Sequence, residues 1–283
     1  MTEPESRSAL KLVISYDGTG FGGSQVQPGQ RTVQGELERA LSALADGDGS
    51  SAPRVVLAGR TDAGVHAAGQ VASLPDFRPD LGNERFLRAI NAQLEPDCAV
   101  VSVERVDAMF HARYDAKWRE YRFRIWSGTA QPLVRNQTWQ RRGGLDQNRM
   151  AVAAGKLIGR HDFASFAGGG EGMPWSSRQE AERGTVRTVM ISTVQEIDPW
   201  WGSDLHGTLI EYRIVADGFL PRMVRTIAGT LISIAQERES IEWIDALLEG
   251  RNRSLAGETA PPQGLTLWRV GYEDDSPDDG VYR

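Results

Sequence analysis

Hydrophobic and polar positions follow two periods along the chain, and these predict strands and amphipathic helices in alternation. Short apolar runs and period-two alternation predict strands at residues 10–16, 54–58, 70–74, 99–106, 120–126, 187–196, 209–217 and 267–270. Apolar residues spaced three and four apart predict helices at residues 32–44, 83–94, 147–158, 221–237 and 241–248. This order fits an α+β protein with two halves, each a sheet with helices on one side.

A polar segment at residues 107–115 separates the two halves of the pattern. We therefore expect an N-terminal domain at residues 1–106, a C-terminal domain at 107–272 and an acidic tail at 273–283. The glycine-rich, polar stretch at 168–184 is long enough to be a mobile surface loop.

Alternation in the predicted strand 120–126 assigns its side chains to two faces. Tyr121, Phe123 and Ile125 share one face, and Arg122 and Arg124 the other, because successive side chains of a strand point to opposite sides.

The segment 59–66, Gly-Arg-Thr-Asp-Ala-Gly-Val-His, follows the short predicted strand 54–58. If strand geometry continues that far, Arg60 and Asp62 point to the same face. A nearby guanidinium keeps a carboxylate ionised, and an ionised carboxylate can act as a nucleophile or base. On spacing alone, a surface ion pair at a strand end is the more common explanation.

Composition and charge limit the classes of protein that fit. The chain has no apolar run long enough for a transmembrane helix, and its acidic, polar start argues against a signal peptide. The single Cys98 sits among apolar residues and is expected to be a buried thiol, so the cytoplasm is the predicted compartment. Four histidines and one cysteine show no spacing typical of zinc, and no metal is expected.

The formal net charge of −6 is concentrated in residues 1–7 and 273–283. Residues 273–283 carry −4 and residues 1–7 carry −1, which leaves about −1 for the rest. Arginines outnumber lysines 29 to 3. Guanidinium groups suit phosphate contact and stacking on bases. A coding bias toward arginine is the preferred explanation of the excess, so charge alone does not predict nucleic-acid binding.

The sequence Gly-x-Gly-x-x-Gly at residues 18–23 follows a predicted strand, as in dinucleotide-binding loops. However, Pro28 and Gly29 intervene before the predicted helix, and the next strand leads to Arg60 where a ribose would need an acidic residue. A glycine-rich loop that lines a cleft, or simply a flexible turn, is the preferred interpretation, and a nucleotide-binding oxidoreductase is the weaker one.

Motifs distributed over most of the chain resemble those of the tRNA pseudouridine synthase A family. Besides the octapeptide 59–66, the resemblance rests on residues 16–21, 31–37, 110–113, 121–123, 162–166, 219, 223–225, 229–231 and 260–265. It implies a pseudouridine synthase fold with two similar domains, mainly antiparallel sheets and a catalytic cleft between them. It also implies that uridines at positions 38, 39 or 40 of the tRNA anticodon stem-loop are isomerised, without a cofactor, by a homodimer that binds tRNA and not DNA.

The resemblance also implies a role for individual residues. Asp62 is the catalytic residue, either the nucleophile at the sugar or the base that generates a glycal. Arg60 holds the flipped nucleotide or fills the space that it leaves. Tyr121 stacks on the target base and removes the proton from C5 late in the reaction. Arg225 pairs with Asp62 from the second domain, and Leu265 packs near the tyrosine.

Two positions depart from the family pattern. Ser24 stands where the family usually has tryptophan, which removes any aromatic contact from this loop, and Arg222 replaces a more common amide or histidine. A catalytically silent RNA-binding homologue of the same fold is the main alternative function, and the presence of Asp62, Tyr121 and Arg225 argues against it.

Overall fold

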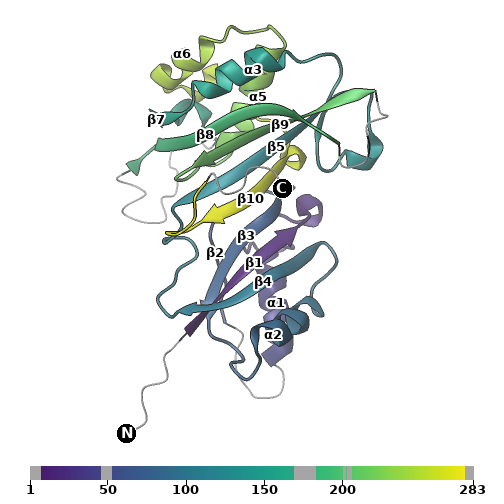
Figure 1. Ribbon diagram of the computed structural model, residues 1–283, viewed down its shortest axis with the longest axis vertical. Coiled ribbons are helices and arrows are strands. Elements are labelled where there is room, and N and C mark those ends of the chain that lie inside the picture. The colour runs from purple at the N-terminus through teal and green to yellow at the C-terminus, as the bar shows by residue number, and fades with distance from the viewer. Residues whose placement is uncertain (1–7, 46–52, 169–182, 200–201, 203–205, 278–283) are drawn as a thin grey trace. The chain divides into compact units, whose positions relative to one another are not determined.

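The computed structural model describes residues 8–45, 53–168, 183–199, 202 and 206–277. The chain divides into two compact units (Figure 1). Unit 1 contains residues 1–117 and 267–276, and unit 2 contains residues 118–266 and 277–283. The chain thus changes unit after residue 117, whereas the sequence places the division after 106. Residues 267–276 return to unit 1.

Unit 1 is a sheet in the order β4-β1-β3-β10, with two helices packed on it. Strand β1 pairs antiparallel with both β3 and β4, and the short β2 pairs with β3. The elements are β1 (Ser8–Tyr16), α1 (Val33–Ala45), β2 (Val56–Leu57), β3 (His66–Pro75), α2 (Asn83–Asn91), β4 (Cys98–Asp107) and β10 (Leu265–Gly271), of which the first two residues belong to unit 2.

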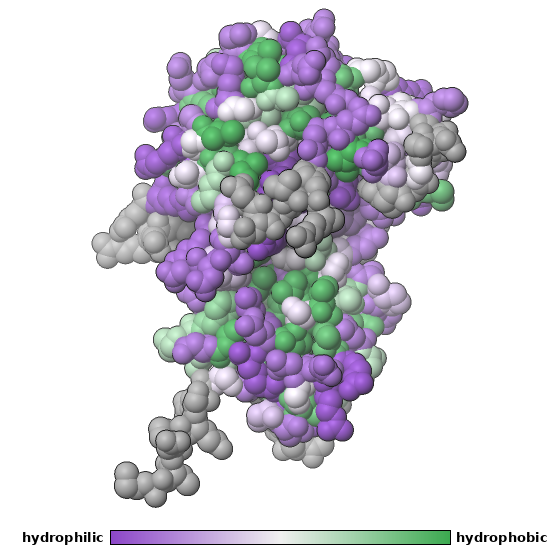
Figure 2. All heavy atoms as spheres, in the orientation of Figure 1, coloured by the Kyte–Doolittle hydropathy of each residue, from purple (hydrophilic) through white to green (hydrophobic). Residues whose placement is uncertain are grey.

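The core of unit 1 forms where the apolar stripes of the helices meet the inner face of the sheet. Leu37 of α1 and Ile90 of α2 are fully buried, as are Leu10 and Leu12 of β1. The outer face is less completely covered: hydrophobic residues gather on the visible side of this unit (Figure 2), and Val101 of β4 is 56% exposed.

Unit 2 contains the antiparallel sheet β5-β9-β8-β7, with the short β6 parallel to β5. Its strands are β5 (Trp118–Gly128), β6 (Trp139–Arg141), β7 (Gly159–Asp162), β8 (Val186–Ile197) and β9 (Gly207–Ala216), and its helices are α3 (Gln147–Gly155), α5 (Met223–Ala235) and α6 (Trp243–Gly250). Helix α5 is buried on almost every side and packs on α3 and β5. A helix that is apolar all round belongs in a core.

The α+β class predicted from the sequence is confirmed, and each predicted strand and helix has a counterpart. Two differences matter. The strand expected at 54–58 is reduced to the two residues of β2, and the short strands β6 and β7 were not predicted. Most of the loop expected to be mobile at 168–184 lies outside the described residues.

Candidate active site

Asp62 lies in the connection between β2 and β3, at the start of a tight turn. The N–H of Val65 donates to the carbonyl of Asp62 over 3.1 Å, and Gly64 has a φ of 80°. Turns of this kind favour glycine at that position. Because β2 ends at Leu57, the expectation that strand geometry aligns Arg60 with Asp62 is wrong. Instead Arg60 is exposed and Asp62 is half-buried.

The residue before Asp62 is held by the loop that follows β1. The N–H of Thr61 donates to Ser24 Oγ over 2.8 Å, and the N–H of Ser24 donates to the Thr61 carbonyl over 3.1 Å. Thr61 Oγ1 is 2.8 Å from the hydroxyl oxygen of Tyr16. All three residues are buried. The sequence pointed to Ser24 only as a departure from the family, and gave no sign that it meets Thr61.

The glycine-rich loop 18–23 does not have the arrangement of a dinucleotide site. The N–H of Gly18 donates to His66 Nδ1 over 3.0 Å, so it is already engaged, and α1 begins only at Val33. His66 Nδ1 also lies 3.1 Å from Asp17 Oδ1. Although burial opposes the effect, hydrogen bonds from Thr19 hold the pKa of Asp17 below its usual value. His66 thus has a hydrogen-bonding role in holding this loop.

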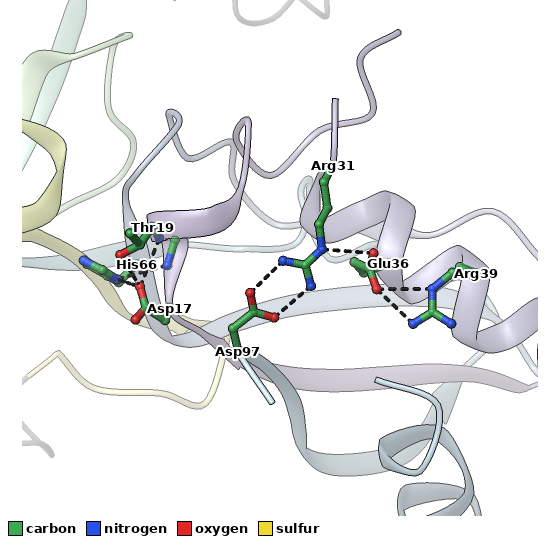
Figure 3. Close-up of polar contacts among 8 residues, drawn as sticks. Asp17, Thr19, Arg31, Glu36, Arg39, His66 and Asp97 are labelled. Atoms are coloured by element: carbon green, nitrogen blue, oxygen red, sulfur yellow. Dashed lines mark hydrogen bonds and ion pairs between the residues drawn. The ribbon is translucent and has the colours of Figure 1, made fainter. Parts of the chain in front are cut away.

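A chain of ion pairs fixes the far end of the same loop (Figure 3). Arg31 donates two hydrogen bonds to Asp97, of 2.6 and 2.8 Å, and a third to Glu36. Glu36 in turn receives hydrogen bonds from Arg39, and the Arg31 guanidinium lies 4.2 Å from the ring centre of Phe21. These contacts join the loop to α1 and to the start of β4. The loop beside Asp62 is therefore anchored at both ends.

Tyr121 lies on β5 in unit 2, on the face predicted for it with Phe123. It is 8% exposed, and its ring packs edge-on against Phe219 with centroids 5.0 Å apart. Leu265, the first residue of β10, is also buried. Both side chains are thus buried. Burial is also expected of residues that serve only in the hydrophobic core, so it does not distinguish a site role from a core role.

Arg225 lies in the first turn of α5 and is only partly exposed. Its Nε donates to the carbonyl of Ala260 over 2.8 Å, and the N–H of Ala260 donates back to the Arg225 carbonyl over 3.0 Å. This reciprocal pair orients the side chain from the opposite segment. Arg222, which departs from the family pattern, is exposed and lies at the N-cap of α5, where its backbone has the left-handed conformation (φ 57°).

The opposite face of β5 carries a buried network of charges that sequence reasoning missed. Glu120 binds Arg122 and Arg213, and Glu211 binds Arg122 and Arg124, with nitrogen–oxygen distances of 2.8 to 3.4 Å. Arg122 and Arg124 were correctly assigned to a common face. Their carboxylate partner Glu211 lies on β9, nearly ninety residues away, and local alternation gave no signal for it.

Of the predicted site residues, Arg60 and Asp62 belong to unit 1, and Tyr121, Arg225 and Leu265 to unit 2. Their meeting at one site stays a prediction. Over the described ranges, no cluster of three or more His, Cys, Asp or Glu side chains could hold a metal ion. Within the same ranges, every helix is too short or too polar to span a membrane.

Comparison with known proteins gives a consistent result. A family model described as tRNA pseudouridine synthase matches residues 12–115 and 153–273. A tRNA pseudouridine synthase A of Geobacillus kaustophilus is 41% identical over 268 residues, covering 94% of this chain and 95% of the relative. One from Chloroflexus aurantiacus is 40% identical, covering 93% and 88%. A solved Cas6 product complex, with 13% identity and a TM-score of 0.22, is too dissimilar to carry an argument.

Proposed function

Since the chain belongs to the tRNA pseudouridine synthase A family, we propose that it modifies uridines 38, 39 or 40 of the tRNA anticodon stem-loop with Asp62 as the catalytic residue. Family membership makes the chain an isomerase that converts uridine to pseudouridine in tRNA. The choice of uridines and the role of Asp62 are the parts that we propose.

The observation that carries the proposal is the construction of the Asp62 segment. The carboxylate belongs to a half-buried residue on a tight turn, and the preceding residue is tied into the core by three hydrogen bonds. An exposed ion pair at a strand end would need no such support. Fixed geometry of this kind is what a reacting group requires, because small displacements lower reaction rates strongly.

The reaction assigns Asp62 one of two roles. The N–C glycosidic bond must break, the base must turn, and a C–C bond must form at C5, which then loses its proton while the freed N1 gains one. Asp62 either attacks the sugar as a nucleophile or removes a sugar proton to give a glycal, and both routes return the carboxylate unchanged.

The other site residues act on the nucleotide. A base inside a stem must leave its stack before its atoms can be reached. Arg60 is exposed and lies two residues before Asp62 in the chain, so it is suited to hold the flipped nucleotide. In our proposal Tyr121 stacks on the target base, Leu265 packs near it, and Arg225 pairs with the Asp62 carboxylate.

Two further features belong to the same proposal. We expect the chain to act in the cytoplasm, where tRNA is modified, and as a homodimer. The exposed apolar residues on unit 1, such as Val101, suit a surface that another copy covers. Light scattering at several concentrations would measure the mass, and a monomer at all of them would contradict the dimer.

The experiment compares tRNA from a strain that lacks this protein with tRNA from the same strain expressing wild type, Asp62→Asn or Asp80→Asn. Asp80 is an exposed carboxylate paired with Arg78, and serves as the matched control. Chemical mapping should find pseudouridine at positions 38 to 40 with wild type and Asp80→Asn only. With purified enzymes, Asp62→Asn should be slower by at least about 1000-fold. Pseudouridine formation by Asp62→Asn at the wild-type rate would refute the assignment.

A further inference from the structure

Both peptide groups that flank Asp62 are hydrogen-bonded. On one side, the carbonyl of Thr61 accepts the N–H of Ser24 over 3.1 Å. On the other, the carbonyl of Asp62 accepts the N–H of Val65 over 3.1 Å. A peptide group is planar and includes the Cα atoms on either side. Fixing these two carbonyls therefore fixes the Cα of Asp62 and the direction of its Cα–Cβ bond.

Ser24 contributes twice to this arrangement. Its N–H binds the Thr61 carbonyl, and its Oγ accepts the Thr61 N–H over 2.8 Å, so both backbone groups of Thr61 bind the same residue. The Ser24 side chain is fully buried, with no exposed surface. It is therefore not available to touch RNA, unlike an exposed side chain of a binding loop.

Ser24 is itself held by α1. Its carbonyl accepts the N–H of Gln34 over 2.9 Å, in the first turn of the helix, and Leu37 anchors that helix in the core. The neighbouring Gly23 has a φ of 105°, and a Cβ there would lie 3.1 Å from the Thr61 carbonyl oxygen. Glycine suits this position because it adopts the positive φ without strain and adds no side chain at the close approach to Thr61. A continuous series of fixed groups thus leads from α1 to Asp62.

We infer that Ser24 is a positioning residue for Asp62, which it orients through the backbone of Thr61. This inference rests on the proposed catalytic role of Asp62. It gives residue 24 a function inside the protein, at the position where the family usually has tryptophan. A displacement of about 1 Å at a reacting group can lower the rate by about 100-fold, so loosening Thr61 is sufficient to impair the reaction.

Ser24→Ala tests the inference because it removes the acceptor and leaves the buried N–H of Thr61 without it. We expect the single-turnover rate at saturating tRNA to fall by about 10- to 100-fold, while the dissociation constant for tRNA changes by less than about 3-fold. Ser73→Ala is the matched control. Ser73 is a buried serine of the same unit, and its Oγ accepts the N–H of Ala112 over 3.0 Å. Its rate should stay within about 3-fold of wild type.

A second measurement does not depend on activity. Hydrogen exchange at residues 60–65 should become faster in Ser24→Ala and stay unchanged in Ser73→Ala, because exchange reports local opening. Tyr16→Phe, which keeps the ring and removes only the hydroxyl that meets Thr61, should give a smaller change in the same direction. It replaces Ser24→Ala in both measurements if that variant does not fold.

The inference is overturned if Ser24→Ala keeps the wild-type single-turnover rate, if it slows no more than Ser73→Ala, or if exchange at residues 60–65 does not change. Failure of the proposed function has a different signature. In that case Asp62→Asn is as active as wild type, while hydrogen exchange still decides whether Ser24 fixes the backbone at Asp62.

Discussion

Glu120 and Arg213 join the neighbouring strands β5 and β9 through two hydrogen bonds of 3.0 and 3.1 Å, and both residues are at most 5% exposed. Tyr121, the next residue along β5, points to the other face and pairs in register with Ile214, the next residue along β9. The strand that carries the predicted base-stacking tyrosine is therefore fixed by charge on one face and by apolar packing on the other.

Glu120→Gln should lower the free energy of unfolding by about 3–5 kcal/mol, because the Arg213 charge stays buried without its carboxylate. Glu258→Gln is the control in the same unit. Glu258 is 62% exposed and lies 4.0 Å from Arg141, so its loss should change stability by less than about 1 kcal/mol. Urea unfolding measures the free energy of unfolding of both variants. An equal decrease in the two would show that the buried pair contributes no more to stability than the exposed one.

Arg60→Ala should lower turnover more than it lowers tRNA affinity. The reason is that a residue which holds a flipped nucleotide acts after the initial complex has formed. Single-turnover rates at saturating tRNA and equilibrium binding separate the two effects. Equal losses in both would identify Arg60 as a phosphate contact instead.

The stability of the protein should fall between pH 10 and pH 12, in part through Tyr16. Burial raises the pKa of Tyr16 to about 12, against about 10 in the unfolded chain. The folded state favours the neutral phenol, so this contribution is complete below pH 10 and is lost as the pH rises through the native pKa. Urea unfolding across this range should show a smaller loss for Tyr16→Phe. Parallel curves for the two proteins would contradict this account.

At low pH, by contrast, the stability of the protein should fall because acid weakens the Arg31–Asp97 pair. Hydrogen bonds from Arg31 lower the pKa of Asp97 although burial opposes this. The stabilisation is therefore complete above the unfolded pKa of about 3.9 and is lost as the pH falls through the lower native value. At pH 7, Asp97→Asn should have a lower melting temperature than wild type. Between pH 7 and pH 3, its melting temperature should fall less steeply than that of wild type. An unchanged acid profile in the variant would exclude Asp97 as a contributor.

The sequence predicted those features that depend on neighbours along the chain. Alternation in β5 correctly separated Tyr121 from Arg122, because the side-chain period of a strand is local. It could not show that Arg122 is buried, since burial depends on Glu211 of β9. The strands β6 and β7, of three and four residues, are too short to show a period.

The candidate site shows the same limit. The octapeptide identified Asp62 through a resemblance, but its support comes from Tyr16 and Ser24, which are 46 and 38 positions earlier. From the sequence, serine in place of tryptophan indicated only that this loop lacks an aromatic contact. Only the fold brings it against Thr61, where its hydroxyl has a structural partner.

The return of residues 267–276 to unit 1 has a consequence for synthesis of the protein on the ribosome. Strand β10 borders β3, and it begins 190 positions after β3 ends along the chain. Until then, the N–H and C=O groups along the part of that edge of β3 that the short β2 does not cover have no strand to pair with, and an open edge can pair with another chain. The nascent protein thus exposes this edge to other chains until β10 has been made and pairs with β3.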